Sequence, residues 1–327
     1  MRILVTGAAG FIGSHLAERL AADGHTVVGL DNFAPFYAPA LKRANAKRLA
    51  DHGIRVWPLD LATDPLTPAL DGVEAVFHLA AQPGLSAATS EADFVRNNVR
   101  ATERLLDALA HQPQVRALLY ASSSSVYGLD ATHTESDGDL APTSAYGRTK
   151  LQAERAICSA RRNAPWDACI LRLFSVYGPR ERPDKLIHKA IRCAQSGHPF
   201  PLHAGSEQHT RSFTYVGDAV AGLVAALDRF DRCAGETINV GSPVSVSTLQ
   251  ALETVASVLD TPLRLHRTPT RPGDQTHTRA RIAKARRLLD VAPATSLRDG
   301  IAAEVDWIAT LAPSHTERPV AHASDTS

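Results

Sequence analysis

A glycine-rich turn between an apolar strand and a helix is the feature that most restricts the fold of this chain. Gly7, Gly10 and Gly13 directly follow the strand-like run 2–6 and open an amphipathic segment over 11–22. Glycine at such places lets the backbone turn tightly and approach a pyrophosphate, while the start of the helix offers unpaired N–H groups to phosphates. The spacing is G-x-x-G-x-x-G, and a lone motif of this kind is also typical of a turn that binds nothing. A nucleotide site therefore needs a second signal.

An acid at the end of the second expected strand supplies that signal. Asp31 lies 18 residues after Gly13, near the spacing of about 20 at which such folds place the carboxylate that binds an adenosine ribose. A carboxylate accepts hydrogen bonds from both ribose hydroxyls but repels a 2′-phosphate, and the neighbouring Asn32 carries no cation. We therefore expect NAD rather than NADP as the cofactor, with Lys42 and Arg43 as solvated helix charges.

Short apolar runs alternate with longer amphipathic segments through the first half of the chain. This pattern predicts strands at 2–6, 26–30, 54–58, 74–79, 116–121 and 167–172. Between them it predicts helices at 11–22, 39–51, 91–110 and 144–163. Strands that alternate with helices form a doubly wound parallel sheet, a Rossmann-type α/β fold.

After residue 175 the pattern loosens into pieces punctuated by proline and glycine. Helices are expected near 185–197, 217–229, 247–259 and 297–310, with short strands near 200–203 and 211–215. The chain of 327 residues has room for about two domains. We expect an NAD-binding domain over 1–175, to which some later segments return, a smaller interleaved α/β substrate domain over 176–312, and a disordered tail over 313–327.

Composition excludes several classes of partner and site. Lys and Arg number 35 against 34 Asp and Glu, so no overall charge favours nucleic acid or a membrane surface. The opening residues lack the apolar region and cleavage site of a signal peptide, and no run approaches the roughly 18 apolar residues of a membrane span, so a cytoplasmic protein is expected. The four cysteines show no C-x-x-C spacing, so we expect no zinc site or other metal site and interpret them as reduced thiols. They are Cys158, Cys169, Cys193 and Cys233.

A tyrosine and a lysine are placed for proton transfer beside the cofactor. Tyr146 and Lys150 are four residues apart and share one face of an expected helix. The serine run 122–125 ends the fifth strand, at the sheet edge where doubly wound folds bind ligands. A lysine that lowers the phenol pKa, a tyrosine that moves the proton and a serine that orients the reacting oxygen are what hydride transfer coupled to proton transfer needs.

Together these motifs resemble the extended short-chain dehydrogenase/reductases of the nucleotide-sugar epimerase and dehydratase group, from residue 1 to about residue 307. The resemblance implies that the catalytic hydroxyl is Ser123, five residues before Gly128. At the next two positions, 4,6-dehydratases carry Asp-Glu and UDP-glucuronate decarboxylases carry Glu at the second. This chain has Ser124 and Ser125 there, so both eliminating chemistries lack an acid that they use.

Two segments are more similar to one branch, the UDP-glucuronate 4-epimerases. Residues 171–184, LRLFSVYGPRERPD, are similar to its F-T-V-Y-G-P-x-x-R-P-D segment, and residues 31–33 with 39–44 are similar to its D-N-F…P-x-L-K-R-A stretch. UDP-glucose 4-epimerases typically carry Asn at the position that Ser175 occupies in this chain. A surface arginine before a turn is the alternative for Arg182. The resemblance implies a sugar carboxylate surrounded by Ser124, Ser125, Ser175 and Arg182.

Further matches extend the cofactor and diphosphate sites. Arg211 lies in a segment similar to the family's R-D-F-x-x-V strand, and Arg271 and Asp274 lie in one similar to its R-x-G-D loop; the planar fork of arginine suits phosphate oxygens. Asp60 is expected either to meet the adenine edge or to cap the next turn. The expected cofactor residues are Gly7, Gly10, Phe11, Ile12, Gly13, Asp31, Asn32, Asp60, Leu61, Leu79, Ala80, Ala81, Asn98, Tyr146 and Lys150.

The resemblance implies C4 epimerisation of a UDP-sugar through a transient 4-keto intermediate, with UDP-glucuronate and UDP-galacturonate as the expected pair. Ser86 departs from the branch, which has an arginine there. Alternatives are an epimerase of UDP-glucose or UDP-N-acetylglucosamine, a reductase of 4-keto sugars, and a non-catalytic nucleotide sensor. The helices at 91–110 and 144–163 suit the four-helix interface of a homodimer in this family.

Overall fold

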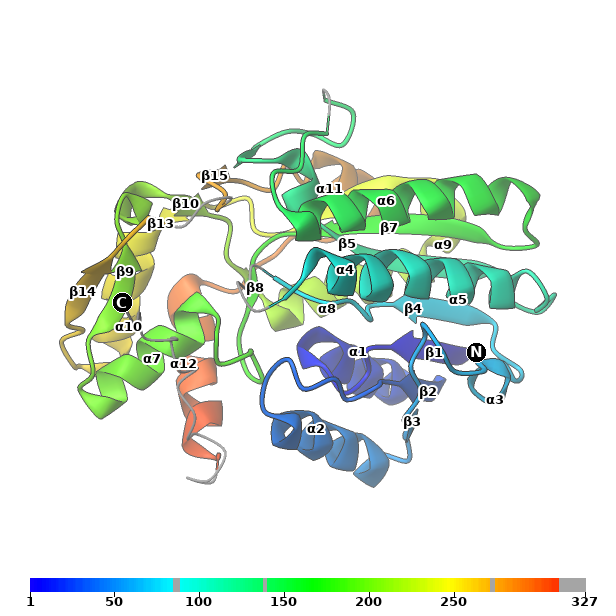
Figure 1. The fold of residues 1–327 in the computed structure, drawn as a ribbon, viewed down its shortest axis with the longest axis horizontal. Helices are drawn as coiled ribbons and strands as arrows, with labels where there is room; N and C mark the ends of the chain where they lie inside the picture. Colours follow the sequence, from blue (N-terminus) through cyan, green and yellow to red (C-terminus); the bar gives the residue numbers. More distant parts are fainter. Residues whose placement is uncertain (85–88, 138–139, 271–273, 312–327) are drawn as a thin grey trace.

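The computed structural model describes residues 1–84, 89–137, 140–270 and 274–311, which form two lobes (Figure 1). The larger lobe is built on one sheet whose strands all run parallel. In spatial order its strands are β12 (Thr237–Val240), β7 (Asp167–Leu173), β5 (Ala117–Ser123), β4 (Ala75–His78), β1 (Arg2–Thr6), β2 (Thr26–Leu30) and β3 (Arg55–Trp57). The predicted doubly wound α/β fold is confirmed.

Successive side chains of strand β1 pack into two separate hydrophobic cores. Ile3 and Val5 pack with one helix layer, whereas Leu4 between them packs with the other, because successive side chains of a strand point to opposite faces. The first layer contains α1 (Phe11–Ala22), α8 (Val216–Asp228), α9 (Phe230–Cys233) and α11 (Ala283–Leu289). The second contains α3 (Thr67–Leu70), α5 (Ala101–Leu109) and α6 (Ala145–Ala160). Helix α2 (Pro39–Asp51) packs beside α1 and β3.

Two expected elements are divided in the structure. The helix expected at 91–110 consists of α4 (Glu91–Phe94), a π-helical segment η1 (Val95–Arg100) and α5; a π-turn takes one more residue per turn and often marks a functional site. The strand expected at 211–215 is split into β10 (Thr210–Arg211), which joins β13 (Val246–Ser247) and β15 (His277–Thr278), and β11 (Thr214–Tyr215), which joins β8 (Val176–Tyr177). The strand β12 and the two-residue strands β6 (Asp130–Ala131), β8, β13 and β15 were not expected, because runs this brief show little periodicity.

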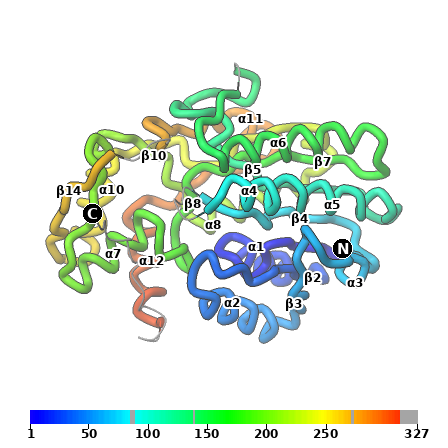
Figure 2. Tube along the Cα trace, in the orientation of Figure 1, coloured from blue at the N-terminus to red at the C-terminus, as the bar shows by residue number. Residues whose placement is uncertain are grey.

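The smaller lobe surrounds its own apolar core. Its helices are α7 (Leu186–Ser196), α10 (Thr248–Leu259) and α12 (Leu297–Ala309), beside the parallel pair β9 (Phe200–His203) and β14 (Leu265–Thr268). Figure 2 shows how β8 leads the chain from the sheet of the first lobe toward these helices. Of the helices in the described ranges, none is both long and apolar enough to cross a membrane.

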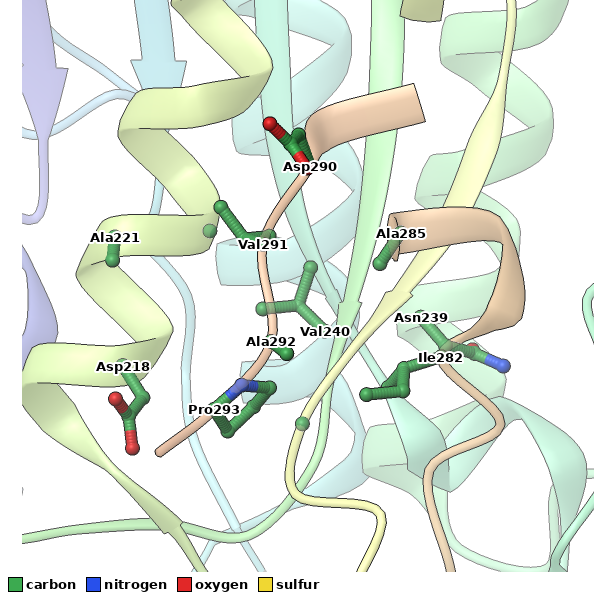
Figure 3. Close-up of a pocket in the computed structure, with 12 residues that line it drawn as sticks. Asp218, Ala221, Asn239, Val240, Ile282, Ala285, Asp290, Val291, Ala292 and Pro293 are labelled. Atoms are coloured by element: carbon green, nitrogen blue, oxygen red, sulfur yellow. The ribbon is translucent and has the colours of Figure 1, made fainter. Parts of the chain in front are cut away.

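A cavity of about 250 Å³ lies in the larger lobe (Figure 3), and none of the predicted catalytic residues is among the residues that line it. It is enclosed by α8, the end of β12, α11 and the segment 290–293, and its walls are mostly aliphatic. The two carboxylates on its walls already have partners, since Asp218 accepts a hydrogen bond from the Thr295 N–H and Asp290 pairs with Arg229. Ser123, one of the predicted catalytic residues, lies instead at the carboxyl edge of the sheet, at the end of β5.

Candidate active site

The glycine turn lies where β1 and β4 end side by side. Gly7 has a φ of +72°, and a Cβ on it would lie 2.9 Å from the Ala80 nitrogen. A Cβ on Gly13 would overlap the Gly7 carbonyl oxygen. Thr6 Oγ1 accepts hydrogen bonds from the N–H groups of Leu79 and Ala80, at 3.2 and 3.1 Å, so the loop 79–81 lies against the turn. Among the described side chains none caps the start of α1, so its first N–H groups, including those of Phe11 and Ile12, can donate hydrogen bonds to a phosphate.

Asp31 is buried at the end of β2 beside this turn. Its Oδ2 accepts from the Ala9 N–H at 3.2 Å and its Oδ1 from the Phe33 N–H at 2.8 Å. Lys42 Nζ lies 3.4 Å from the same Oδ1. The expectation that Lys42 is a solvated helix charge is wrong, because the first turn of α2 brings its ammonium group to the Asp31 carboxylate. Arg43 is exposed, as expected.

Asp60 and Asn32 meet at the ends of neighbouring strands. Asp60 Oδ1 accepts from the Ala62 N–H at 2.8 Å, and its Oδ2 accepts from Asn32 Nδ2 at 3.2 Å and Arg96 Nη2 at 3.0 Å. Burial alone would raise the pKa of Asp60, but these hydrogen bonds hold it below its usual range. Asp60 therefore caps a turn and stays ionised, while Leu61 lies in the core below it.

Asn98 ties the cofactor loop to the catalytic helix. From the π-helical segment, its Oδ1 accepts from the Gln82 N–H at 2.6 Å, and its Nδ2 donates to Thr149 Oγ1 at 3.0 Å. Thr149 immediately precedes Lys150 on α6. The amide of Asn98 is thus engaged by the protein, and it holds the loop after Ala81 against the helix that carries Tyr146.

Ser123 and Tyr146 are brought together at the carboxyl end of β5. The Ser123 hydroxyl accepts from the Ser125 N–H at 3.1 Å and is hydrogen-bonded to the Tyr146 phenol. Burial raises the pKa of Tyr146, and the Ser123 hydrogen bond and the nearby Arg182 guanidinium partly offset that rise. The phenol therefore has a hydroxyl partner and a cation in its surroundings.

The Lys150 side chain contacts β5, the strand that ends at Ser123. Its Nζ donates to the Ala121 carbonyl oxygen at 2.6 Å and lies 4.1 Å from the centroid of the Tyr120 ring. Burial lowers the pKa of Lys150 to about 7, and the charge of Glu154 acts in the opposite direction.

The serines expected around a sugar carboxylate lie on the two segments that leave β5 and β7. Ser124 is buried and its hydroxyl is 3.5 Å from Gln275 Oε1, while Ser125 hydrogen-bonds Ser123. Gln275 Nε2 also donates to the Gly128 carbonyl oxygen at 2.8 Å. Ser175 is half-buried between β7 and β8.

Arg182 reaches the catalytic edge from the segment that links the lobes. Its side chain is 13% exposed, and its Nε and Nη2 atoms donate hydrogen bonds to the Asp184 carboxylate at 2.9 and 2.8 Å. The guanidinium lies 5.2 Å from the Phe36 ring centroid and next to Gly84. Because its charge also acts on the Tyr146 phenol, it lies near the catalytic tyrosine.

Arg211 and Asp274 form an ion pair in the second lobe. Arg211 Nη2 is 3.3 Å from Asp274 Oδ1, and its Nη1 donates to the Thr210 carbonyl oxygen at 3.1 Å. Arg211 also acts on Lys185, so it lies near the segment that carries Arg182. Arg271, Ser86 and the expected tail 313–327 lie outside the described residues.

A buried polar network under the site was not predicted. Glu154 accepts from Arg172 Nη2 at 2.8 Å and from the Ser122 hydroxyl at 2.5 Å, and Arg172 Nη1 donates to the Tyr127 hydroxyl at 3.0 Å. The sequence held two signals for it. Glu154 follows Lys150 by four residues on the same helix face, and Arg172 stands inside an apolar strand, where an arginine needs a partner.

Comparisons with known proteins agree with this geometry. Residues 3–241 match the model of the NAD-dependent epimerase/dehydratase family. A Bacillus subtilis protein named as an uncharacterized UDP-glucose epimerase is 36% identical, over 95% of this chain and 99% of its own length. UDP-glucuronate 4-epimerase 1 of Arabidopsis thaliana is 33% identical, over 98% of this chain and 79% of its own.

A solved structure is similar over nearly the whole chain. The crystal structure of UDP-glucuronic acid 4-epimerase from Bacillus cereus in complex with UDP-glucuronic acid and NAD is 35% identical, with a TM-score of 0.89 over 94% of this chain and 99% of that one. The resemblance inferred from the motifs is confirmed. With its glycine turn, its parallel sheet and a family match across most of its length, this chain belongs to the NAD-dependent epimerase/dehydratase family.

Proposed function

We propose that this protein is an isomerase that interconverts UDP-glucuronate and UDP-galacturonate by NAD-dependent epimerisation at C4. One observation carries the choice of sugar. The Arg182 guanidinium lies near the Tyr146 phenol, where its charge offsets part of the rise that burial causes in the phenol's pKa, and in a glucuronate the carboxylate is attached to C5, next to the carbon that reacts. A cation beside the base therefore fits a sugar acid, and named UDP-glucuronate 4-epimerases are among the similar proteins.

The residues around the glycine turn fit NAD. Backbone atoms lie where a Cβ on Gly7 or Gly13 would be, so glycine at these positions lets the turn pack closely against α1 and the loop 79–81. Such a turn is the one that binds a pyrophosphate at the start of the helix. Asp31 offers its carboxylate to the ribose hydroxyls. NAD, when bound, accepts a hydride from C4 of the sugar and returns it to the opposite face.

Tyr146 is the proposed base and acid. Its phenolate takes the proton of the C4 hydroxyl as the ketone forms and returns it as the new hydroxyl forms. Ser123, already hydrogen-bonded to the phenol, orients the reacting oxygen. Lys150, whose ammonium group is buried one helical turn along α6, is proposed to orient the nicotinamide ribose and to favour the phenolate by its charge.

Two groups of residues are proposed to hold the substrate at its ends. Ser124, Ser125 and Ser175 donate hydroxyl hydrogen bonds to the carboxylate, and Arg182 does so in place of its contact with Asp184. At the other end, Arg211 binds the diphosphate together with Arg271, and Asp274 orients Arg211. The Rossmann lobe, residues 1–175 with α8, β12 and α11, is proposed to hold NAD, and the rest of 176–312 to hold the UDP-sugar.

The test is proton NMR of the purified protein with UDP-glucuronate, UDP-glucose and UDP-xylose, each incubated separately. We expect UDP-galacturonate to appear from UDP-glucuronate without added NADH. A faster reaction of UDP-glucose would favour a neutral-sugar epimerase, the activity in the name of the Bacillus subtilis relative. Consumption of external NADH would indicate a 4-keto reductase, and retention of NAD without turnover would indicate a nucleotide sensor.

A homodimer is proposed to form through α5 and α6. These two helices lie side by side on one face of the sheet (Figure 1), and the same pair from a second copy would complete a four-helix bundle. Light scattering coupled to size-exclusion chromatography should give twice the mass of one chain. A monomeric mass would contradict this assembly and leave the proposed chemistry unaffected.

A further inference from the structure

Two glutamates are buried against each other behind the segment that carries Arg182. Glu181 precedes Arg182 in the turn after β8, and Glu304 lies on α12. They are 1% and 0% exposed, and their carboxyl groups lie close enough for a hydrogen bond between them. Two neighbouring carboxyl groups that are both buried repel each other if both are ionised, so the ionisation of Glu181 opposes that of Glu304.

The pair joins three separate elements. Glu304 Oε2 accepts from the Gly178 N–H at 3.1 Å, at the start of the turn. Glu181 Oε2 accepts from the His188 N–H at 3.3 Å, in the first turn of α7, where a helix favours a negative charge. The Glu181 N–H itself donates to the Gly178 carbonyl oxygen at 2.9 Å. The turn is therefore fastened to α7 and α12 through one pair of side chains.

The charged groups around the pair favour one ionised carboxylate rather than two. Burial raises the pKa of both carboxyls, and Lys185 is a cation that acts against this rise at each of them. His188 Nδ1 is 3.6 Å from Glu304 Oε1, but burial lowers the pKa of His188 to about 4, so this ring is neutral. The other charged or titratable groups that face the pair or its immediate neighbours from β8, β11, α7, α8 and the turn are Tyr177, Tyr215, Arg192, Asp218, Arg182 and Asp184.

We propose that Glu181 and Glu304 share one proton and that this pair positions Arg182 for the carboxylate of the sugar, an inference that rests on the proposed function. Glu181 holds the turn from behind, and the Lys185 N–H closes it by donating to the Arg182 carbonyl oxygen at 3.1 Å. The Arg182 side chain leaves in another direction, toward Gly84 and Phe36. Glu181 and Glu304 are thus positioning residues, which act on the substrate through Arg182.

Loss of the shared proton would change the position of the turn that carries Arg182. Two carboxylates at hydrogen-bond distance repel each other, and the turn is the part that can move, because α7 and α12 are packed in the core of the lobe. A displacement of about 1 Å at a residue that orients substrate can cost about 10²-fold in rate. The effect should fall on substrates that carry a carboxylate and spare those that do not.

The shared proton is tested first, in the protein without substrate. Carbon NMR of the protein labelled at glutamate carboxyls should show one protonated carboxyl at about pH 8, where an ordinary glutamate is ionised. This signal should be lost in Glu304→Gln and kept in Asp306→Asn, which changes an exposed acid on the same helix. Full ionisation of the wild-type carboxyls at that pH would overturn the proposal, whatever the protein's substrate is.

Kinetics then test the effect on Arg182. Glu304→Leu, which removes the pair, should raise the KM for UDP-glucuronate at least about tenfold and change any turnover of UDP-glucose by less than about threefold. Glu304→Gln should stay within about twofold of wild type, since the amide N–H can donate to Glu181 in place of the shared proton. The wild-type KM should rise with pH as that proton is lost, whereas the KM of Glu304→Gln should not.

The outcomes separate this inference from the proposed function. If Glu304→Leu impairs both sugars equally, or Glu304→Gln is as impaired as Glu304→Leu, the pair is structural and the inference is wrong. If Glu304→Leu does not fold, the pH profile of Glu304→Gln decides by itself. A wild type without turnover of UDP-glucuronate removes the proposed function, while the NMR titration still decides whether the proton is shared.

Discussion

Lys150 donates from Nζ to the Ala121 carbonyl oxygen, 2.6 Å away, and is almost completely buried. Its ammonium group thus lies in a place where desolvation lowers its pKa to about 7. A lysine in such a position weakens the fold, because the unfolded chain keeps its proton up to about pH 10.4. The charge is therefore held one helical turn from Tyr146 at the expense of stability.

The first prediction follows from this position. Lys150→Met should abolish turnover and raise the free energy of unfolding at pH 7 by about 1–3 kcal/mol, since the apolar side chain has no charge to desolvate. Between about pH 7 and 10.4 the unfolded wild type binds more protons than the folded form, so wild-type stability rises with pH. The advantage of the variant should shrink over this range in urea unfolding. An advantage that grows with pH would contradict the buried charge.

The second prediction concerns Tyr146. Tyr146→Phe keeps the ring, which lies 6.4 Å from that of Phe94, and removes the exchangeable proton and its hydrogen bond to Ser123. Turnover should fall by at least about 10²–10⁴-fold while NAD remains bound, as measured by steady-state kinetics and by the absorbance of the purified protein. Tyr215→Phe, the same change in the second lobe, should leave turnover near wild type. Wild-type rates in Tyr146→Phe would assign the proton transfer to another group.

Sequence patterns located the glycine turn, Asp31, Ser123 and Tyr146 because each depends on local spacing along a strand or a helix. The parallel sheet followed from the same alternation. Contacts between segments distant in sequence were not predictable in this way. The pairing of Lys42 with Asp31 depends on how α2 packs beside α1 and β3, and the contact between Glu181 and Glu304 joins residues that lie on separate elements of the second lobe. Neither contact produces a periodic pattern or a motif in the sequence.

The third prediction uses the pairing of Lys42 with Asp31 to test cofactor choice. Asp31→Ala should weaken NAD binding, because the ribose hydroxyls lose their acceptor, and should bring the affinities for NAD and NADP closer together. Lys42, released from its ion pair, would then be a cation available to a 2′-phosphate. The double variant Asp31→Ala/Lys42→Ala should lose that gain for NADP, as measured by calorimetry. Equal affinities for both cofactors in the wild type would contradict the role given to Asp31.

The last prediction separates a sugar acid from a neutral sugar as substrate. Oxidation of C4 in a glucuronate gives a β-keto acid, which loses carbon dioxide when the bond to its carboxylate aligns with the carbonyl π system. An epimerase must therefore hold that carboxylate charged and out of alignment. Arg182 offers a forked pair of charge-assisted hydrogen bonds, each worth about 1.5–3 kcal/mol, once the substrate replaces Asp184.

Arg182→Ala should therefore lower kcat/KM for UDP-glucuronate at least about tenfold, since about 1.4 kcal/mol corresponds to one decade. It should also release some UDP-pentose by decarboxylation, detectable by mass spectrometry, and change any slow turnover of UDP-glucose little, because that sugar has no carboxylate to hold. Arg43→Ala, at an exposed position on α2, is the matched control. An equal loss on both sugars would make Arg182 a structural or phosphate-binding residue, and a wild type that prefers UDP-glucose would exclude the glucuronate assignment altogether.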